Sequence, residues 1–271
     1  ESGWWTLDSS PASDPRSGAP GRWRAMLALG AFLLAGALAM AAPTEWPKDW
    51  VRGLLRQVVG ICAFDAAHLG VSFPCDSVTQ QDEHALGYAV LRSPGLRTEV
   101  LVVPTAPADG IESPLLRQQV ATPLWAAAWA ARARVEAAFG HSLPRWRVAL
   151  TVNARGTRTQ DQFHIHVDCL YAPVEAALEA HAGAISANWS MFPNRLRGER
   201  YWARTIASSD LAGVNVLEMA DAMPGASAEP SRVTLALVGT QLPGGREGFV
   251  LLGNSDDRSA ERLMDHGCRG A

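Results

Sequence analysis

Residues 160–170 read QDQFHIHVDCL and contain two histidines, His164 and His166, separated by a single apolar residue. In an extended strand alternate side chains share a face, so His164, His166 and Asp168 point to one side. The intervening apolar side chains point to the other side, where a core can bury them: Phe163, Ile165 and Val167. A slip of one residue would exchange the two faces, so the pattern specifies the register. We expect the carboxylate of Asp168 to face solvent.

The segments around this stretch predict more strands and several helices. Period-two runs bounded by turn residues predict six strands: Arg147–Asn153, Phe163–Tyr171, Tyr88–Leu91, Thr98–Val103, Val233–Gly239 and Gly248–Leu252. The first two are the clearest, and a polar loop containing Gly156 joins them as a hairpin. Helical spacing and helix-start residues predict three helices: Trp50–Ala67, Leu124–Phe139 and Pro173–Trp189. Antiparallel strands with intervening helices indicate the α+β class.

The composition is that of a folding chain. Of 271 residues, 48% are hydrophobic and 19% are charged, which is unlike a disordered sequence. The net charge is -3 and there is no long block of lysine or arginine. Because affinity for the phosphate backbone comes mainly from clustered cations, we do not expect a nucleic-acid partner.

An apolar run near the N-terminus predicts export. Residues 25–42 carry no charge and nearly reach the length that crosses a hydrocarbon core of about 30 Å. Residues 1–24 are rich in serine, proline and glycine, so we expect them to be disordered. Arginines precede the run, so we expect this tail to be cytoplasmic and the rest of the chain to lie on the extracytoplasmic side. The segment 25–44 is either a permanent single-pass anchor in the inner (plasma) membrane, which we favour, or a cleaved signal peptide.

Four cysteines agree with an oxidising compartment. Their positions are Cys62, Cys75, Cys169 and Cys268. Four cysteines allow three connectivities, and sequence alone does not select one. We expect local pairing of Cys62 with Cys75, which leaves Cys169 to pair with Cys268 beside the histidine strand.

Two histidines on one strand face allow three interpretations. They are ordinary surface residues, they supply two ligands to a metal ion, or one of them is a nucleophile. Cys169 points to the opposite face and no acidic or histidine-rich partner motif is apparent, so a metal site is disfavoured. A neutral imidazole attacks phosphorus well when a neighbouring group holds its other nitrogen in the correct tautomer.

The motif from Gln162 to Asp168 resembles the His-x-His-x-His motif of the histidine-triad (HIT) superfamily. The resemblance is closer to one branch of the superfamily, the CDP-diacylglycerol pyrophosphatases (CDP-diacylglycerol hydrolases). The other segments that carry the likeness are Gly110–Leu116, the chain from Asn153 into the motif, Leu196–Gly198 with Tyr201, Ala203 and Arg204, the four cysteines and the N-terminal apolar run. The resemblance implies a catalytic domain over residues 50–271. It also implies an antiparallel sheet of about five strands backed by helices and preceded by an N-terminal membrane helix.

The resemblance implies roles for particular residues. His164 falls on the nucleophile of the family, and His166 falls on the histidine that assists it. Gln162 replaces the first histidine of the motif; a glutamine can donate a hydrogen bond to a phosphate oxygen but cannot carry a proton in the same way. Other candidate donors to the pyrophosphate lie in the preceding loop: Asn153, Arg155, Arg158, Thr159 and Gln160. No metal ion or other cofactor is required by this chemistry.

The expected reaction is hydrolysis of CDP-diacylglycerol to CMP and phosphatidate through a nucleotidyl-histidine intermediate. The expected partners are this lipid and the membrane itself, which the basic and aromatic stretch 191–202 would contact. A homodimer is a further option, since many HIT proteins dimerise. Two alternatives remain: an exported hydrolase of other nucleotide diphosphates, and a non-catalytic nucleotide-binding protein of the cell envelope.

Overall fold

The computed structural model describes residues 51–269, all within a unit that spans Pro47–Ala271. The predicted tail 1–24 and the predicted membrane segment 25–44 lie outside the described residues. Among residues 51–269, no helix combines the length and the apolar character needed to cross a bilayer.

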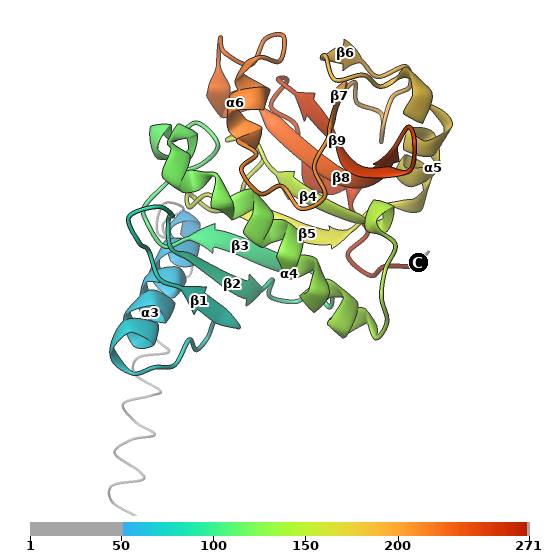
Figure 1. Ribbon diagram of the computed structural model, residues 1–271. Helices are drawn as coiled ribbons and strands as arrows, with labels where there is room; N and C mark the ends of the chain where they lie inside the picture. The colour runs from blue at the N-terminus through green and yellow to red at the C-terminus, as the bar shows by residue number, and fades with distance from the viewer. Residues whose placement is uncertain (1–50, 270–271) are drawn as a thin grey trace, which may run out of the picture. The chain divides into compact units, whose positions relative to one another are not determined.

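One antiparallel sheet of nine strands organises residues 51–269, in the order β1-β2-β3-β5-β4-β8-β9-β7-β6 (Figure 1). Its strands are β1 Ser77–Thr79, β2 Tyr88–Arg92, β3 Val100–Pro104, β4 Val148–Val152, β5 Ile165–Cys169, β6 Ser190–Met191, β7 Trp202–Ile206, β8 Thr234–Leu242 and β9 Arg246–Asn254. The prediction of about five strands is therefore wrong. Strands β1 and β6 are three and two residues long, too short for an alternating pattern to be seen in the sequence.

The strand that carries the histidines lies in the middle of this sheet. Strand β5 pairs with β3 on one side and with β4 on the other, where His166 lies opposite Leu101 and Thr151. Both neighbours were predicted as strands, and the antiparallel pairing of β4 with β5 is confirmed. His164 directly precedes β5, so it lies where the strand enters the sheet.

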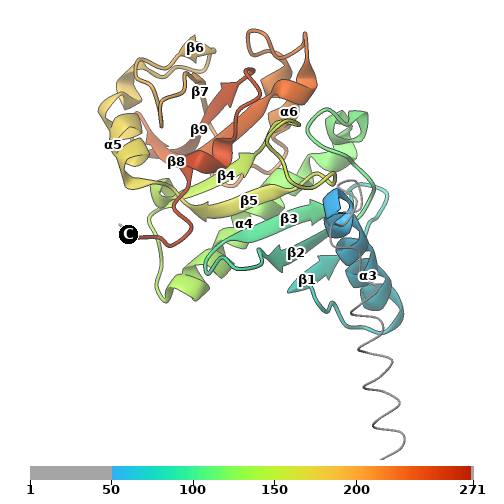
Figure 2. The same cartoon turned by 180° about the vertical axis from the view of Figure 1, so that it is seen from behind.

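Helices cover both faces of the sheet. The helices are α3 Leu54–His68, α4 Pro123–Phe139, α5 Ala172–Ala180 and α6 Val216–Asp221. Figure 1 shows α4 lying across one face, while Figure 2 shows α3 and α5 near opposite ends of the other. Helix α4 begins and ends almost where predicted because Pro123 opens it and Gly140, at φ 103°, ends it. Helix α5 is shorter than the predicted 173–189, since its C-cap is already His181.

The predicted disulfide pairing is confirmed. Cys62 is joined to Cys75, and Cys169 is joined to Cys268. The second bond fastens the C-terminal segment to the end of β5, where Asp265 also donates a backbone hydrogen bond to the carbonyl of Cys169. A 3₁₀ helix, Ala260–Leu263, precedes this contact. The C-terminal segment is thereby held against the histidine strand.

Candidate functional site

His164, His166 and Asp168 form a row of polar side chains, called the histidine row below. It lies between two apolar clusters on the face of the sheet opposite α4. One cluster, under α3, includes Leu101 of β3, and the other, under α5, includes Ala149 of β4. Strand β5 lies between these two strands. His166 and Asp168 on the strand, and His164 just before it, are buried in the gap between the two clusters. Polar side chains in such a gap must find polar partners, because an unpaired buried polar group is costly.

The imidazole of His164 is buried, oriented and neutral. Only 7% of the residue is exposed, and Nδ1 lies 2.7 Å from the carbonyl oxygen of Gln162. A carbonyl only accepts, so Nδ1 carries the proton and Nε2 keeps its lone pair. Burial, reinforced by the neighbouring His166, lowers the pKa of His164 to about 3. The two rings meet edge to face with centroids 4.7 Å apart.

His166 is held by a buried carboxylate. Its Nδ1 lies 2.9 Å from Oε1 of Glu99, a residue that directly precedes β3 and is 1% exposed. Burial acts to raise the pKa of Glu99, but the hydrogen bond to His166 and the charges of His166 and His266 outweigh it. The pKa of Glu99 is therefore below its usual range, and the side chain is a buried anion.

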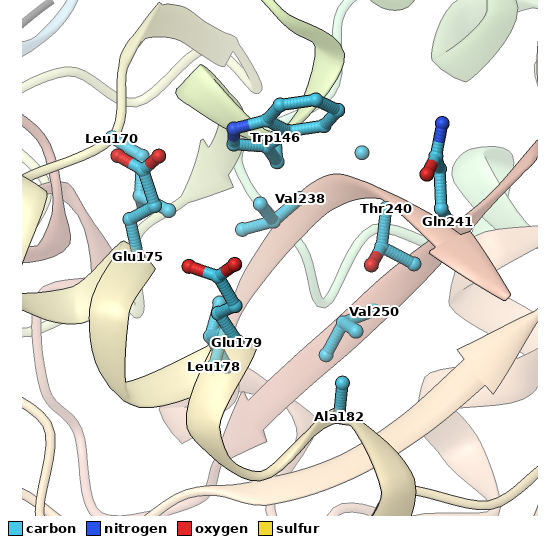
Figure 3. A pocket seen from close by; sticks show the side chains of 11 residues that line it. Trp146, Leu170, Glu175, Leu178, Glu179, Ala182, Val238, Thr240, Gln241 and Val250 are labelled. Carbon is cyan, nitrogen blue, oxygen red and sulfur yellow. The ribbon is translucent and has the colours of Figure 1, made fainter.

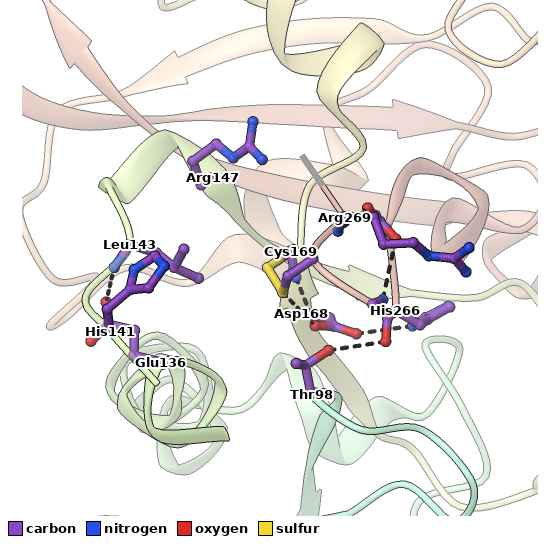
Figure 4. The surroundings of a disulfide bond; sticks show 12 residues. Thr98, Glu136, His141, Leu143, Arg147, Asp168, Cys169, His266 and Arg269 are labelled. Atoms are coloured by element: carbon purple, nitrogen blue, oxygen red, sulfur yellow. Dashed lines mark hydrogen bonds and ion pairs between the residues drawn. A yellow bond between two sulfur atoms is a disulfide. The ribbon is translucent and has the colours of Figure 1, made fainter. Parts of the chain in front are cut away.

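The C-terminal segment adds a third histidine, His266, which lies beside Asp168 (Figure 4). Nδ1 of His266 donates to Oδ2 of Asp168 at 3.0 Å and lies 3.4 Å from Oε1 of Glu99. The expectation that Asp168 faces solvent is wrong, because the residue is fully buried and also accepts from the backbone N–H of Cys169. The hydrogen bond to Asp168 raises the pKa of His266 despite burial, and the charge of Glu99 adds to this effect.

Glu261 lies at the Nε2 atoms of His166 and His266. Its carboxylate oxygens lie 3.7 Å from Nε2 of His166 and 3.6 Å from Nε2 of His266. Oε2 also accepts a hydrogen bond of 2.8 Å from Nδ2 of Asn153. Asn153, a predicted substrate contact, therefore lies beside the histidines, with its Nδ2 3.5 Å from Nε2 of His166.

Arg158 is brought next to His164 and is fixed there. Its guanidinium makes two hydrogen bonds of 2.8 Å to Glu112 and one of 3.0 Å to Asp161. It lies directly against Gly110, where a Cβ would overlap its nitrogen, so a larger residue at this position would displace the guanidinium. Gly110, Arg158 and His164 line the same narrow hollow, and the predicted motif 110–116 is therefore the clamp that holds Arg158.

The hydrogen bonds of the Gln162 side chain go to groups other than the histidine rings. Its Nε2 donates to the carbonyls of Pro104 and Ala106, and its Oε1 accepts from Nε of Arg56 on α3. These bonds occupy the amide and tie the entry of β5 to α3. A contact between Gln162 and phosphate stays a prediction.

The other predicted loop contacts lie further out. Gln160 accepts from the backbone N–H of Leu55 and donates to the carbonyl of Val51, so it joins the loop to the start of α3. Arg155 is exposed and lines a polar hollow next to Arg158, and Thr159 is exposed. The substrate roles predicted for these three residues stay predictions.

Two groups of side chains have the spacing of metal ligands among the described residues. Glu99, Glu261 and His266 offer ligand atoms within 4.8 Å of one another. Direct ion pairs among these three residues account for that spacing without an added cation. The second group combines Asp168 with two cysteine sulfurs that are consumed in a disulfide.

A separate hollow of about 250 Å³ lies between α5 and strands β8 and β9 (Figure 3). Trp146 and Val238 contribute to its wall, as do the carboxylates of Glu175 and Glu179. None of the histidines of the row lines this hollow. This hollow therefore lies apart from the candidate catalytic residues.

In the predicted lipid-facing stretch 191–202, the arginines are exposed but two of the aromatic side chains point into the fold. Phe192 and Tyr201 are 2% and 1% exposed and belong to the apolar cluster under α5. Their burial contradicts the expectation that these aromatic side chains face a membrane. Within residues 51–269, large exposed apolar side chains gather instead on α3 and the loop that follows it: Ile61, Phe64, Leu69, Val71 and Phe73.

The sequence did not predict three residues of the site: Glu99, Glu261 and His266. Glu99 had a signal, since it is a lone acidic residue at the start of an otherwise apolar strand. His266 had a weaker one, because it lies two residues before a cysteine that was expected to reach β5. Glu261 lies in an ordinary charged stretch, and its position became apparent only from the fold.

A central strand that presents imidazoles backed by buried carboxylates defines a site suited to nucleophilic and acid–base catalysis. The model of the family described as CDP-diacylglycerol pyrophosphatase matches residues 51–271. A CDP-diacylglycerol pyrophosphatase of Yersinia pestis is 37% identical over 190 residues, which cover 68% of this chain and 72% of that protein. The chain belongs to the CDP-diacylglycerol pyrophosphatase family and is a hydrolase.

Proposed function

We propose that this protein hydrolyses the pyrophosphate bond of CDP-diacylglycerol to CMP and phosphatidate, with His164 as the nucleophile. The activity named for the family and for the relative from Yersinia pestis supports the substrate. The observation that carries the mechanism is the hydrogen bond from Nδ1 of His164 to the carbonyl of Gln162. It leaves the lone pair of a neutral ring on Nε2, which is the form that attacks phosphorus.

The reaction proceeds in two displacements. Nε2 of His164 attacks the phosphorus that carries the cytidine, and the bond from this phosphorus to the bridging oxygen breaks. The bridging oxygen leaves with the electron pair as part of phosphatidate, while Nδ1 keeps its proton and its bond to the Gln162 carbonyl. Water then attacks the CMP–histidine, the N–P bond breaks, and His164 returns to its neutral form.

Surrounding charges suit the anionic transition states of this pathway. Arg158 supplies a buried cation at the hollow that also contains His164. The amide of Asn153, which lines the same hollow, and the neighbouring ring of His166 supply further polar groups. Such groups are already oriented by their partners, so they stabilise developing charge with little reorganisation.

The test is the fate of His164. His164→Ala should abolish CMP release, and His164→Gly should regain some activity when imidazole is added. Brief incubation of the wild type with CDP-diacylglycerol and rapid quenching should trap CMP on His164, detectable by mass spectrometry after proteolysis. His141→Ala is the matched control, since His141 is exposed and its ring contacts Phe139 and the carbonyl of Ser142. A folded His164→Ala variant with full activity would refute the assignment.

A substrate panel separates the lipid from the alternatives. CDP-diacylglycerol, CDP-choline and ATP are compared for CMP or AMP release with and without detergent. Hydrolysis restricted to CDP-diacylglycerol supports the proposal. Faster turnover of CDP-choline or ATP would favour a hydrolase of soluble nucleotides, and release from none of the three would favour a binding protein.

A further inference from the structure

Three polar groups from different parts of the chain converge on the carboxylate of Glu261. Nε2 of His166 comes from β5, Nε2 of His266 from the C-terminal segment, and Nδ2 of Asn153 from the end of β4. Together they enclose the two carboxylate oxygens. The Glu261 side chain is 30% exposed, so an anion from solvent can reach the same place.

Two of these groups are fixed as donors. Oδ1 of Asn153 accepts from Oγ of Ser259 at 3.0 Å and from the backbone N–H of Glu261, so its NH₂ group must face the carboxylate. His266 has a carboxylate on each side, with Asp168 at Nδ1 and Glu261 at Nε2. A ring between two anions is suited to carry protons on both nitrogens, and the pKa of His266 is raised accordingly.

A ring of donors around an anion, next to a neutral nucleophile, is the arrangement that a pyrophosphate needs. We propose that Nε2 of His266 and Nδ2 of Asn153, with His166 beside them, form the seat for a phosphate group of the substrate, and that the carboxylate of Glu261 holds this seat until a phosphate displaces it. His266 is then a further catalytic residue. This inference rests on the proposed function and names the residues that bind the leaving phosphate.

His266 in this seat can also donate and take back the proton that the reaction requires. When the bond to the bridging oxygen breaks, His266 can pass its Nε2 proton to an oxygen of the leaving phosphatidate. When water attacks the CMP–histidine in the second step, the water proton returns to Nε2 of His266. The enzyme then recovers its initial protonation, and the net change is the addition of one water across the pyrophosphate bond.

Glu261 has two other conceivable roles that the test must distinguish. It could be a structural partner that only orients Asn153, or a base that accepts the water proton. In both roles its charge helps the reaction, whereas in our proposal its charge competes with the substrate. Glu261→Gln keeps an oxygen that can accept from Asn153 but removes the negative charge facing His266.

The experiment measures binding of inorganic pyrophosphate to the full chain by isothermal titration calorimetry. Four proteins are compared: the wild type, Glu261→Gln, His266→Gln and, as a matched control, the exposed His141→Gln. Removal of the competing carboxylate should tighten binding about tenfold, since the affinity is no longer reduced by an occupied seat. Loss of the His266 charge should weaken binding about tenfold or more, and the control should match the wild type.

The outcomes discriminate between the two proposals. Unchanged or weaker binding in Glu261→Gln would overturn the seat, and so would unchanged binding in His266→Gln. A gain in affinity cannot arise from misfolding, so the Glu261 variant stays informative even if His266→Gln unfolds. If the affinities change as expected but CDP-diacylglycerol is not hydrolysed, the proposed function fails and the seat stands. If the lipid is hydrolysed while the affinities do not change, the seat is refuted and the proposed function stands.

Discussion

Removal of the two disulfides in turn should cost unequal amounts of stability. The Cys169–Cys268 bond spans 99 residues and the Cys62–Cys75 bond spans 13. In the chain-entropy account, a cross-link stabilises by restricting the unfolded chain, and the effect grows with the logarithm of the loop length. This gives about 4.7 kcal/mol for the long loop and about 2.9 kcal/mol for the short one. The expected difference is about 1.8 kcal/mol.

The two double variants, Cys169→Ala/Cys268→Ala and Cys62→Ala/Cys75→Ala, control for each other. All four cysteines are buried, so each pair loses similar side-chain volume and similar packing. The loop length is then the main difference between the variants.

The assay is unfolding in urea at 25 °C, with the free energy of unfolding extrapolated to water. The long-loop variant should have the lower free energy of unfolding by about 1.8 kcal/mol. It should also hydrolyse substrate more slowly, because His266 lies two residues from Cys268 and loses its covalent tether. Equal losses of stability, or a larger loss in the short-loop variant, would refute the loop-entropy reasoning.

Two further predictions concern the carboxylates of Glu99 and Asp161. Glu99→Gln should lower kcat/KM about a hundredfold, since His166 loses the anion that orients it; wild-type activity in a folded variant would contradict this role. The hydrogen bond from Arg52, against burial and aided by Arg158, lowers the pKa of Asp161 from 3.8 to about 2. A carboxyl whose pKa is lowered by folding stabilises the fold at any pH above its ordinary pKa. This stabilisation is lost as the pH falls toward 2. In thermal denaturation the wild type should therefore melt above Asp161→Asn at about pH 5, with the gap closing near pH 2; a gap independent of pH would exclude this linkage.

Part of the candidate site was predictable because it depends on local periodicity. Alternation along residues 163–169 placed His164 and His166 on one face, and the structure puts both in the same buried row. The same local pattern missed strand β7, which lies in a stretch rich in arginine and aromatic residues. It also misplaced Phe192 and Tyr201, because an aromatic side chain in a basic stretch has no signal for its direction before the helix that covers it is known.

The amino-acid sequence by itself determined the central hairpin and the helix α4, since strand period and capping residues are properties of neighbouring residues. Only the tertiary structure decided what surrounds the imidazoles. Glu99 is 67 residues from His166, and His266 is 98 residues from Asp168. Contacts over such separations depend on the order of strands in the sheet and on the path of the C-terminal segment. Burial then keeps these groups paired, because a polar group in that gap has no water to replace its partner.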